Sequence, residues 1–252
     1  MKLMQKSLFF LAFSLTLPSQ IGLVQAQSLP NTKTWQISQQ FKPKVDNKRN
    51  PTTDGGATRG ISCLINKQES LIPLTPADLV GLTLEKHPTF FWYQPNSTGK
   101  FLKFTILADG KTENLYESKL AIPNEAGIMS FTLPKNAPEL EINRTYQWSV
   151  TLVCDPDDSS GDTWMNAWVE RIQPDDSLLQ DIKKANSRNL SNVYGKAGIW
   201  YEGLNALVQQ RCTDPKNLSV KTKWRQLLES ESVKLNDLVS KKLINSCPVN
   251  NR

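Results

Sequence analysis

The sequence contains a single histidine, His87, among its 252 residues. Hydrolytic triads usually rely on histidine as the general base, and a histidine just before Pro88 is more typical of the entry to a strand. The chain also lacks a Gly-x-Ser-x-Gly elbow, a His-Glu-x-x-His motif and a glycine-rich phosphate loop. No motif names a reaction, so we expect a protein that is not an enzyme and that uses no cofactor.

Cysteine is scarce, and no two of the four cysteines stand at the short spacing that zinc sites favour. We therefore expect no metal site built on them. An even number of cysteines in an exported protein favours disulfides. Three pairings are open, and we favour Cys63 with Cys154 and Cys212 with Cys247, because each pair then lies within one structural unit. In the chain-entropy model each of these long loops would contribute roughly 4 to 5 kcal/mol.

Long hydrophobic runs are missing as well. The apolar run at residues 8–17 has about 10 residues, whereas a membrane span needs roughly 20. Lys2 and Lys6 precede it, and small residues stand three and one places before a cut after Ala26. We therefore predict a signal peptide over residues 1–26, an exported product that is periplasmic or extracellular, and no integral membrane span.

No strong excess of one charge is present. The formal charge is +6 at pH 7, and it falls to +4 without Lys2 and Lys6. Nucleic-acid-binding proteins gather their basic residues on one stripe or helix face, whereas here they are interleaved with acidic ones. We expect the basic clusters to be solvated surface and expect no nucleic-acid partner.

Residues 27–58 are rich in Gln, Asn, Lys, Pro and Thr, which predicts a flexible arm. Over residues 59–173 short β-rich runs alternate with turn residues. In one run Tyr146 and Trp148 alternate with polar residues, so one face is predicted to point inward. We predict an antiparallel, fibronectin type III-like or immunoglobulin-like β-sandwich domain, with strands at residues 61–65, 89–94, 101–108, 114–122, 128–133, 145–154 and 163–172.

After Pro174 the apolar residues recur at the spacing that is typical of a helix. Asp175 and Asp176 can cap a first helix that ends near Lys184, and Thr213-Asp214-Pro215 is typical of a later helix start. The fold class is therefore α+β, with a small helical unit over residues 174–252. Its further helices are predicted at residues 189–196, 199–211, 215–229 and 232–245.

Two local resemblances refine this picture. Residues 140–146 resemble the Leu-x-Pro-x-Thr-x-Tyr run of fibronectin type III domains, in which the Tyr hydroxyl binds the backbone upstream as a tyrosine corner. Cys154 lies eight residues after Tyr146 rather than two, which argues against a true immunoglobulin domain. Residues 194–207 resemble the helix-turn-helix of one tetratricopeptide repeat, although an array needs about three copies.

Seven short blocks stand in order at residues 55–60, 63, 74–76, 88–93, 146–148, 154–156 and 198–201. Together they resemble the exported cyanobacterial family catalogued as domain of unknown function 928. The resemblance covers residues 55–247 and implies export and this architecture, without an activity. The chain departs from it at Asn166 and Ala167, where glycine would be expected before Trp168.

Four tryptophans fall in the β unit, and we expect Trp92 and Trp148 to pack in its core. Trp164 and Trp168 are four residues apart and therefore share one face of a strand. Exposed tryptophan rings stack on sugars or are buried at protein interfaces. Trp164 and Trp168 are thus the candidate interaction surface.

The hairpin at residues 154–162 carries oxygen ligands at alternating positions, as a calcium loop would. An EF-hand loop requires Gly and Glu at the places that Ser160 and Asn166 occupy, and Asp, Pro, Ser and Gly are the residues that turns select. A polar turn is therefore the preferred interpretation. The calcium candidates are Asp155, Asp157, Ser159 and Asp162, and a hydrolase would draw its carboxylates from Asp155, Asp157, Asp158, Asp162 and Glu170.

The leading hypothesis is an exported, non-enzymatic binding or scaffold protein of the cell envelope, with a protein or polysaccharide partner. The alternative is a carbohydrate-binding module for envelope polysaccharide. A hydrolase that uses the clustered carboxylates ranks third.

Overall fold

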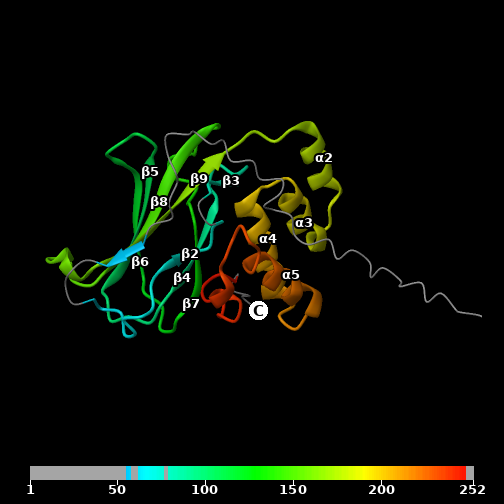
Figure 1. The fold of residues 1–252 in the computed structure, drawn as a ribbon. Helices are drawn as coiled ribbons and strands as arrows, with labels where there is room; N and C mark the ends of the chain where they lie inside the picture. Colours follow the sequence, from blue (N-terminus) through cyan, green and yellow to red (C-terminus); the bar gives the residue numbers. More distant parts are fainter. Residues whose placement is uncertain (1–54, 58–61, 77–78, 248–252) are drawn as a thin grey trace, which may run out of the picture. The chain divides into compact units, whose positions relative to one another are not determined.

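The structure, a computed structural model, describes residues 55–57, 62–76 and 79–247, and these residues belong to one compact unit. The predicted signal peptide lies outside the described residues, as does the predicted arm apart from residues 55–57. Strands precede helices along the chain (Figure 1). The elements are β1 (Gly55–Ala57), β2 (Ile72–Pro73), β3 (Gly81–Thr83), β4 (Thr89–Gln94), β5 (Phe101–Ala108), β6 (Asn114–Leu120), β7 (Gly127–Thr132), β8 (Arg144–Val153), β9 (Thr163–Arg171), α2 (Asp176–Lys184), α3 (Ser187–Lys196), α4 (Trp200–Thr213) and α5 (Leu218–Leu228), with the 3-10 turns η1 (Ser159–Gly161) and η2 (Asn236–Leu238).

The strands form two sheets. A six-stranded sheet has the order β1-β9-β8-β5-β6, and β3 also pairs with β9; a three-stranded sheet has the order β2-β4-β7. All pairs are antiparallel except β3 with β9, which is parallel and departs from the expected pattern. Strand β1 pairs with the first part of β9 and β3 with its last part. The predicted α+β class is confirmed.

The two sheets share a core built from alternate residues of their strands. In β5, β8 and β9 every second side chain is buried, as the period of a strand requires. Phe90 on β4 lies 5.2 Å from Phe104 on β5 and 5.0 Å from Trp148 on β8, measured between ring centroids. Trp92 and Trp148 are both fully buried, as predicted.

Tyr146, near the start of β8, makes the hydrogen bond that its sequence context predicts. Its hydroxyl accepts a hydrogen bond of 2.9 Å from the backbone N–H of Glu141, and the side chain is buried. The turn between the two residues passes through Asn143 in a left-handed conformation, which asparagine tolerates. The hydroxyl thus satisfies a backbone donor where the chain enters the sheet.

The helices begin at side-chain caps. The Asp175 carboxylate accepts from the N–H of Leu178 at 2.7 Å at the start of α2, and Asn186 caps α3 in the same way. Helix α5 begins at Leu218 behind Asn217, whose side chain accepts from the backbone N–H of Val220. The predicted start at Pro215 was therefore three residues early.

The predicted helix at residues 232–245 is wrong. Within it only η2 is helical, and Lys234 and Asn245 adopt left-handed conformations that stop a helix. The segment instead runs beside β7, where Ile244 N–H donates to the Ile128 carbonyl at 2.8 Å and Ile128 N–H donates to the Lys242 carbonyl at 2.7 Å. Backbone pairing with the edge of the three-stranded sheet thus replaces the helical hydrogen bonds.

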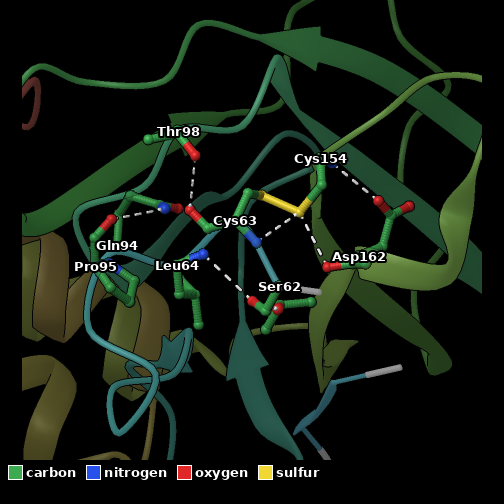
Figure 2. Close-up of a disulfide and its surroundings, with 10 residues drawn as sticks. Ser62, Cys63, Leu64, Gln94, Pro95, Thr98, Cys154 and Asp162 are labelled. Atoms are coloured by element: carbon green, nitrogen blue, oxygen red, sulfur yellow. Dashed lines mark hydrogen bonds between the residues drawn. A yellow bond between two sulfur atoms is a disulfide. The ribbon is translucent and has the colours of Figure 1, made fainter. Parts of the chain in front are cut away.

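Both predicted disulfides are present, with the favoured pairing. Cys63 joins Cys154 and Cys212 joins Cys247. Figure 2 shows the first bond, where Asp162 accepts from the N–H of Cys154 at 2.9 Å and Thr98 lies beside the Cys63 carbonyl. Two disulfides are typical of a protein that folds in an oxidising compartment.

Helix α4 joins the helical part to the strands. The Tyr201 hydroxyl accepts from Trp148 Nε1 at 2.8 Å and donates to the Trp168 carbonyl at 3.0 Å, and Trp200 Nε1 donates to the Leu74 carbonyl at 2.9 Å. Leu74, Trp148, Trp200 and Tyr201 belong to one hydrophobic core. The boundary near residue 173 therefore separates two kinds of secondary structure that share this core. None of the described helices is long and apolar enough to cross a membrane.

Candidate functional site

Trp164 and Trp168 lie on the side of β9 that faces away from the core. Met165, Ala167 and Val169 are completely buried on the opposite side, whereas Trp164 and Trp168 are half-buried. The sequence left open which of these two apolar sides is internal, and the structure resolves that choice. The two tryptophans remain on a side that solvent reaches.

Strand β8 places polar side chains next to these rings. Thr151, Ser149 and Gln147 stand opposite Trp164, Asn166 and Trp168 in the strand register, and all six are half-buried. We call these six residues the outer face. On the other edge of β9, Gly56 pairs with Trp164, and a Cβ built on Gly56 would lie 3.1 Å from the indole ring. Glycine at this position therefore lets the ring rest against β1.

The outer face contains an unsatisfied donor. Trp168 Nε1 is buried and has no hydrogen-bond partner among the residues that the structure describes. A buried donor without a partner costs about 1 to 3 kcal/mol. The nitrogen itself is covered, so a contact with another molecule would be made by the exposed part of the Trp168 ring.

The hairpin at residues 154–162 uses its oxygens within the turn. Asp155 accepts from the N–H of Asp157, and Asp158 accepts from both the N–H and the hydroxyl of Ser160. These hydrogen bonds lower the pKa of Asp158. No group of three or more His, Cys, Asp or Glu side chains within the described part of the chain is arranged to hold a metal ion. The calcium hypothesis for Asp155, Asp157, Ser159 and Asp162 gains no support from this geometry.

The structure separates Glu170 from the other carboxylates that a hydrolase would draw on. Asp155, Asp157 and Asp158 are exposed on the turn. Glu170 is buried at the far end of β9, where its side chain accepts from Thr145 Oγ1 at 3.4 Å. Eight residues of extended chain, about 26 Å, separate Glu170 from Asp162, far beyond the spacing of a glycosidase pair.

A second candidate site, which is concave, was not identified from the sequence. It is a cleft of about 940 Å³ between α3, α4, α5 and the residues just before β4, and we call it the polar cleft. No short sequence motif indicates this cleft, because its residues come from four separate segments and look like those of ordinary solvent-exposed helix faces. It is lined by Glu85, His87, Thr89, Ser187, Arg188, Leu190, Tyr194, Tyr201, Glu202, Asn205, Ala206, Gln209, Gln210, Thr213, Asp214, Asn217, Ser219, Val220 and Lys223.

Glu202, in the first turn of α4, lies at one end of the polar cleft. Its carboxyl group accepts from the Thr83 hydroxyl at 2.5 Å and from the N–H of Leu84 at 3.2 Å. Burial raises the pKa of Glu202 to about 7, although both hydrogen bonds act in the opposite direction. Burial also raises the pKa of Tyr194, and the charges of Glu202 and Glu85 add to this rise. Tyr194 packs beside Gly203, the residue after Glu202, where an added Cβ would lie 3.4 Å from the Tyr194 Cβ.

Two basic residues lie at the other end of the polar cleft. Lys223 on α5 donates to the carbonyl of Arg188 on α3 at 3.3 Å, and partial burial lowers the pKa of Lys223. His87, the single histidine, also lines the cleft, and its Nε2 lies 3.1 Å from the Ala137 carbonyl oxygen. The cleft thus combines opposite charges with amide and hydroxyl groups.

Comparison with known proteins gives a family for the chain. No curated protein and no solved structure matches it. The model of one protein family, described as Domain of Unknown Function (DUF928), matches residues 54–243, which span both sheets and helices α2 to α5. The match covers most of the chain, which therefore belongs to the DUF928 family.

Proposed function

We propose that this chain is an exported, non-enzymatic binding or scaffold protein of the cell envelope, and that the outer face is its recognition surface. One observation carries the proposal: Trp164 and Trp168 remain half-exposed on a strand whose other side is fully buried. They stand about 13 Å apart along β9. Export rests on the predicted signal peptide and agrees with the two disulfides.

The scaffold behind the outer face is rigid. Strand β9 is paired along its length with β8, and the Trp168 carbonyl is held by the Tyr201 hydroxyl. Tryptophan is enriched among residues that dominate protein interfaces, since a rigid ring buries a large area at little entropic cost. The strand order and the Tyr146 hydrogen bond also support a fibronectin type III-like sandwich as the platform.

The test compares Trp164→Ala, Trp168→Ala and the double variant with the unaltered chain, each purified with both disulfides intact. Envelope proteins cross-linked to the chain would be identified, purified and titrated against each variant. We expect at least about a tenfold loss of affinity in the double variant. Leu218→Ala is the matched control, because Leu218 is 78% exposed on α5, away from the outer face. Equal affinity for the unaltered chain and the double variant would refute the assignment.

A carbohydrate-binding module is the second candidate, and the polar row on β8 favours it. Gln147, Ser149 and Thr151 place amide and hydroxyl groups beside the two rings, which is the combination that recognises sugar hydroxyls and stacks on sugar faces. Titration with envelope polysaccharide fragments separates the candidates. Saccharide binding that is lost in Trp164→Ala and Trp168→Ala would favour the module, whereas a protein partner with the same dependence would favour the scaffold.

A further inference from the structure

The polar cleft has opposite charges at its two ends. Glu85 and Glu202 lie together at one end, because the Thr83 hydroxyl donates to Glu202 and accepts from the N–H of Glu85, and Gly203, next to Glu202, packs beside Tyr194. At the other end the Lys223 ammonium group donates to the backbone carbonyl of Arg188. Arg188 and Tyr194 both belong to α3 and are six residues apart, so the two ends are separated by about 9 Å. A ligand that matches this pattern carries a positive charge and a negative charge at about that distance.

Other titratable groups also face the cleft. Asp214 lies at the end of α4, beyond Gln210, and its carboxylate accepts from the Asn217 amide at 2.9 Å. Gln210 contacts the Ser187 carbonyl, next to Arg188, which places Asp214 on the basic side. Two cations against one carboxylate still leave that side positive. His87 lies on the acidic side, and its Nε2 is already close to the Ala137 carbonyl.

The middle of the cleft offers neutral amide groups. Asn205 and Gln209 are four residues apart on α4, share one face of the helix, and are both half-buried. The Gln209 amide lies 3.5 Å from the Asn205 side-chain oxygen, which is at the outer limit of a hydrogen bond and easily exchanged for a ligand contact. Side-chain amides match the donors and acceptors of a peptide backbone.

We propose that the polar cleft is a binding site for a short extended peptide, with the peptide's ammonium group at the exposed carboxylate of Glu85 and its carboxylate at Arg188 and Lys223. Three extended residues span about 10 Å, which fits the separation of the two charged ends. Arginine recognises a carboxylate through two parallel hydrogen bonds, whereas the exposed carboxylate of Glu85 accepts from an ammonium group. This site is separate from the outer face and does not depend on its proposed role.

The test uses trialanine and two blocked forms of it, one N-acetylated and one C-amidated, titrated against the full chain by calorimetry and NMR. We expect trialanine to bind and each block to weaken binding by about tenfold, as the loss of one charged contact predicts. Arg188→Gln should remove the preference for the free carboxylate, and Glu85→Gln should remove the preference for the free amine. Both residues are exposed, so neither substitution is expected to disturb folding.

Trp164→Ala with Trp168→Ala is the control, because it alters the outer face and should leave trialanine binding unchanged. No binding of trialanine, or equal binding of the free and blocked peptides, would overturn the proposal. Binding of a neutral oligosaccharide that trialanine does not displace, and that Arg188→Gln and Glu85→Gln leave unchanged, would assign the cleft to sugars instead. A loss of partner binding at the outer face alone would leave the peptide site intact, so the two proposals fail separately.

Discussion

Glu202 and Thr83 are joined by a hydrogen bond of 2.5 Å that ties the first turn of α4 to β3. The two residues are 119 positions apart in the sequence, and both are buried. The Glu202 carboxyl group also accepts from the N–H of Leu84 just after β3, and β3 itself pairs with β9. One acidic side chain thus links the helical part to the edge of the six-stranded sheet.

The burial of the Glu202 carboxyl group should make stability depend on pH. The pKa of Glu202 is about 7 in the folded chain against 4.5 for an unperturbed glutamate. Between these pH values the folded protein retains a proton that the unfolded chain releases. The stability contributed by the protonated Glu202 carboxyl group is therefore complete below pH 4.5 and is lost as the pH rises to 7. Over this pH range the free energy of unfolding of the unaltered chain should fall by roughly 3 kcal/mol relative to that of Glu202→Gln.

Urea unfolding of both proteins at a series of pH values measures this difference. Glu113→Gln is the control, because Glu113 is exposed and takes no part in the hydrogen bonds of Glu202. A constant difference in unfolding free energy between the unaltered chain and Glu202→Gln across the window would contradict the assigned pKa.

The Tyr146 hydroxyl should be worth a measurable part of the fold's stability. In Tyr146→Phe the backbone N–H of Glu141 loses its acceptor, and a half-buried donor left unpaired costs about 1 to 2 kcal/mol. Tyr116→Phe is the matched control, since the Tyr116 hydroxyl makes no hydrogen bond with any described residue and the side chain is half-buried on β6. Equal unfolding free energies for the two variants would show that the hydroxyl contributes nothing.

Sequence patterns predicted this fold best where alternation was strong and local. The long strands β5, β8 and β9 and the capped helix α2 follow from side-chain period and from Asp175. Strands β2 and β3 have two and three residues and include Pro73 and Gly81. They are therefore too short to show the alternation of apolar and polar residues that marks a strand. Their formation depends on partners that are far along the chain, and local propensity does not encode those partners.

The candidate sites show the same limit. Trp164 and Trp168 were identified because two large apolar residues at a spacing of four stand out on a strand. The polar cleft was missed because Glu85, Tyr194 and Lys223 are ordinary residues that only the tertiary fold brings together. The buried position of Glu202 was equally hidden, since a glutamate in the first turn of a helix usually faces solvent.

Gly81 should tolerate no side chain. A Cβ on this residue would lie 2.7 Å from Cε2 of Tyr201, and the Tyr201 ring cannot move freely because its hydroxyl binds both Trp148 and Trp168. Gly81→Ala should therefore cost about 1 to 3 kcal/mol, as overpacking does. Gly55→Ala is the control, since its Cβ would meet its nearest atom at an ordinary 3.5 Å. A lower unfolding temperature for Gly55→Ala than for Gly81→Ala would contradict the packing argument.

The disulfide between Cys212 and Cys247 should anchor the C-terminal segment against α4. It closes a loop of 35 residues, whereas Cys63 and Cys154 close one of 91, so chain entropy predicts similar losses of about 4 and 5 kcal/mol on removal. The structural effects should differ, because the segment that ends at Cys247 pairs with β7 through Ile128 and Ile244. In Cys212→Ser with Cys247→Ser, hydrogen exchange should therefore accelerate in residues 241–247 and at Ile128, which lose their tether. In Cys63→Ser with Cys154→Ser these amides should keep their protection relative to the rest of the chain. Equal acceleration throughout the chain in both variants would contradict this prediction. It would mean that the disulfide acts only by restricting the unfolded chain and holds no local segment in place.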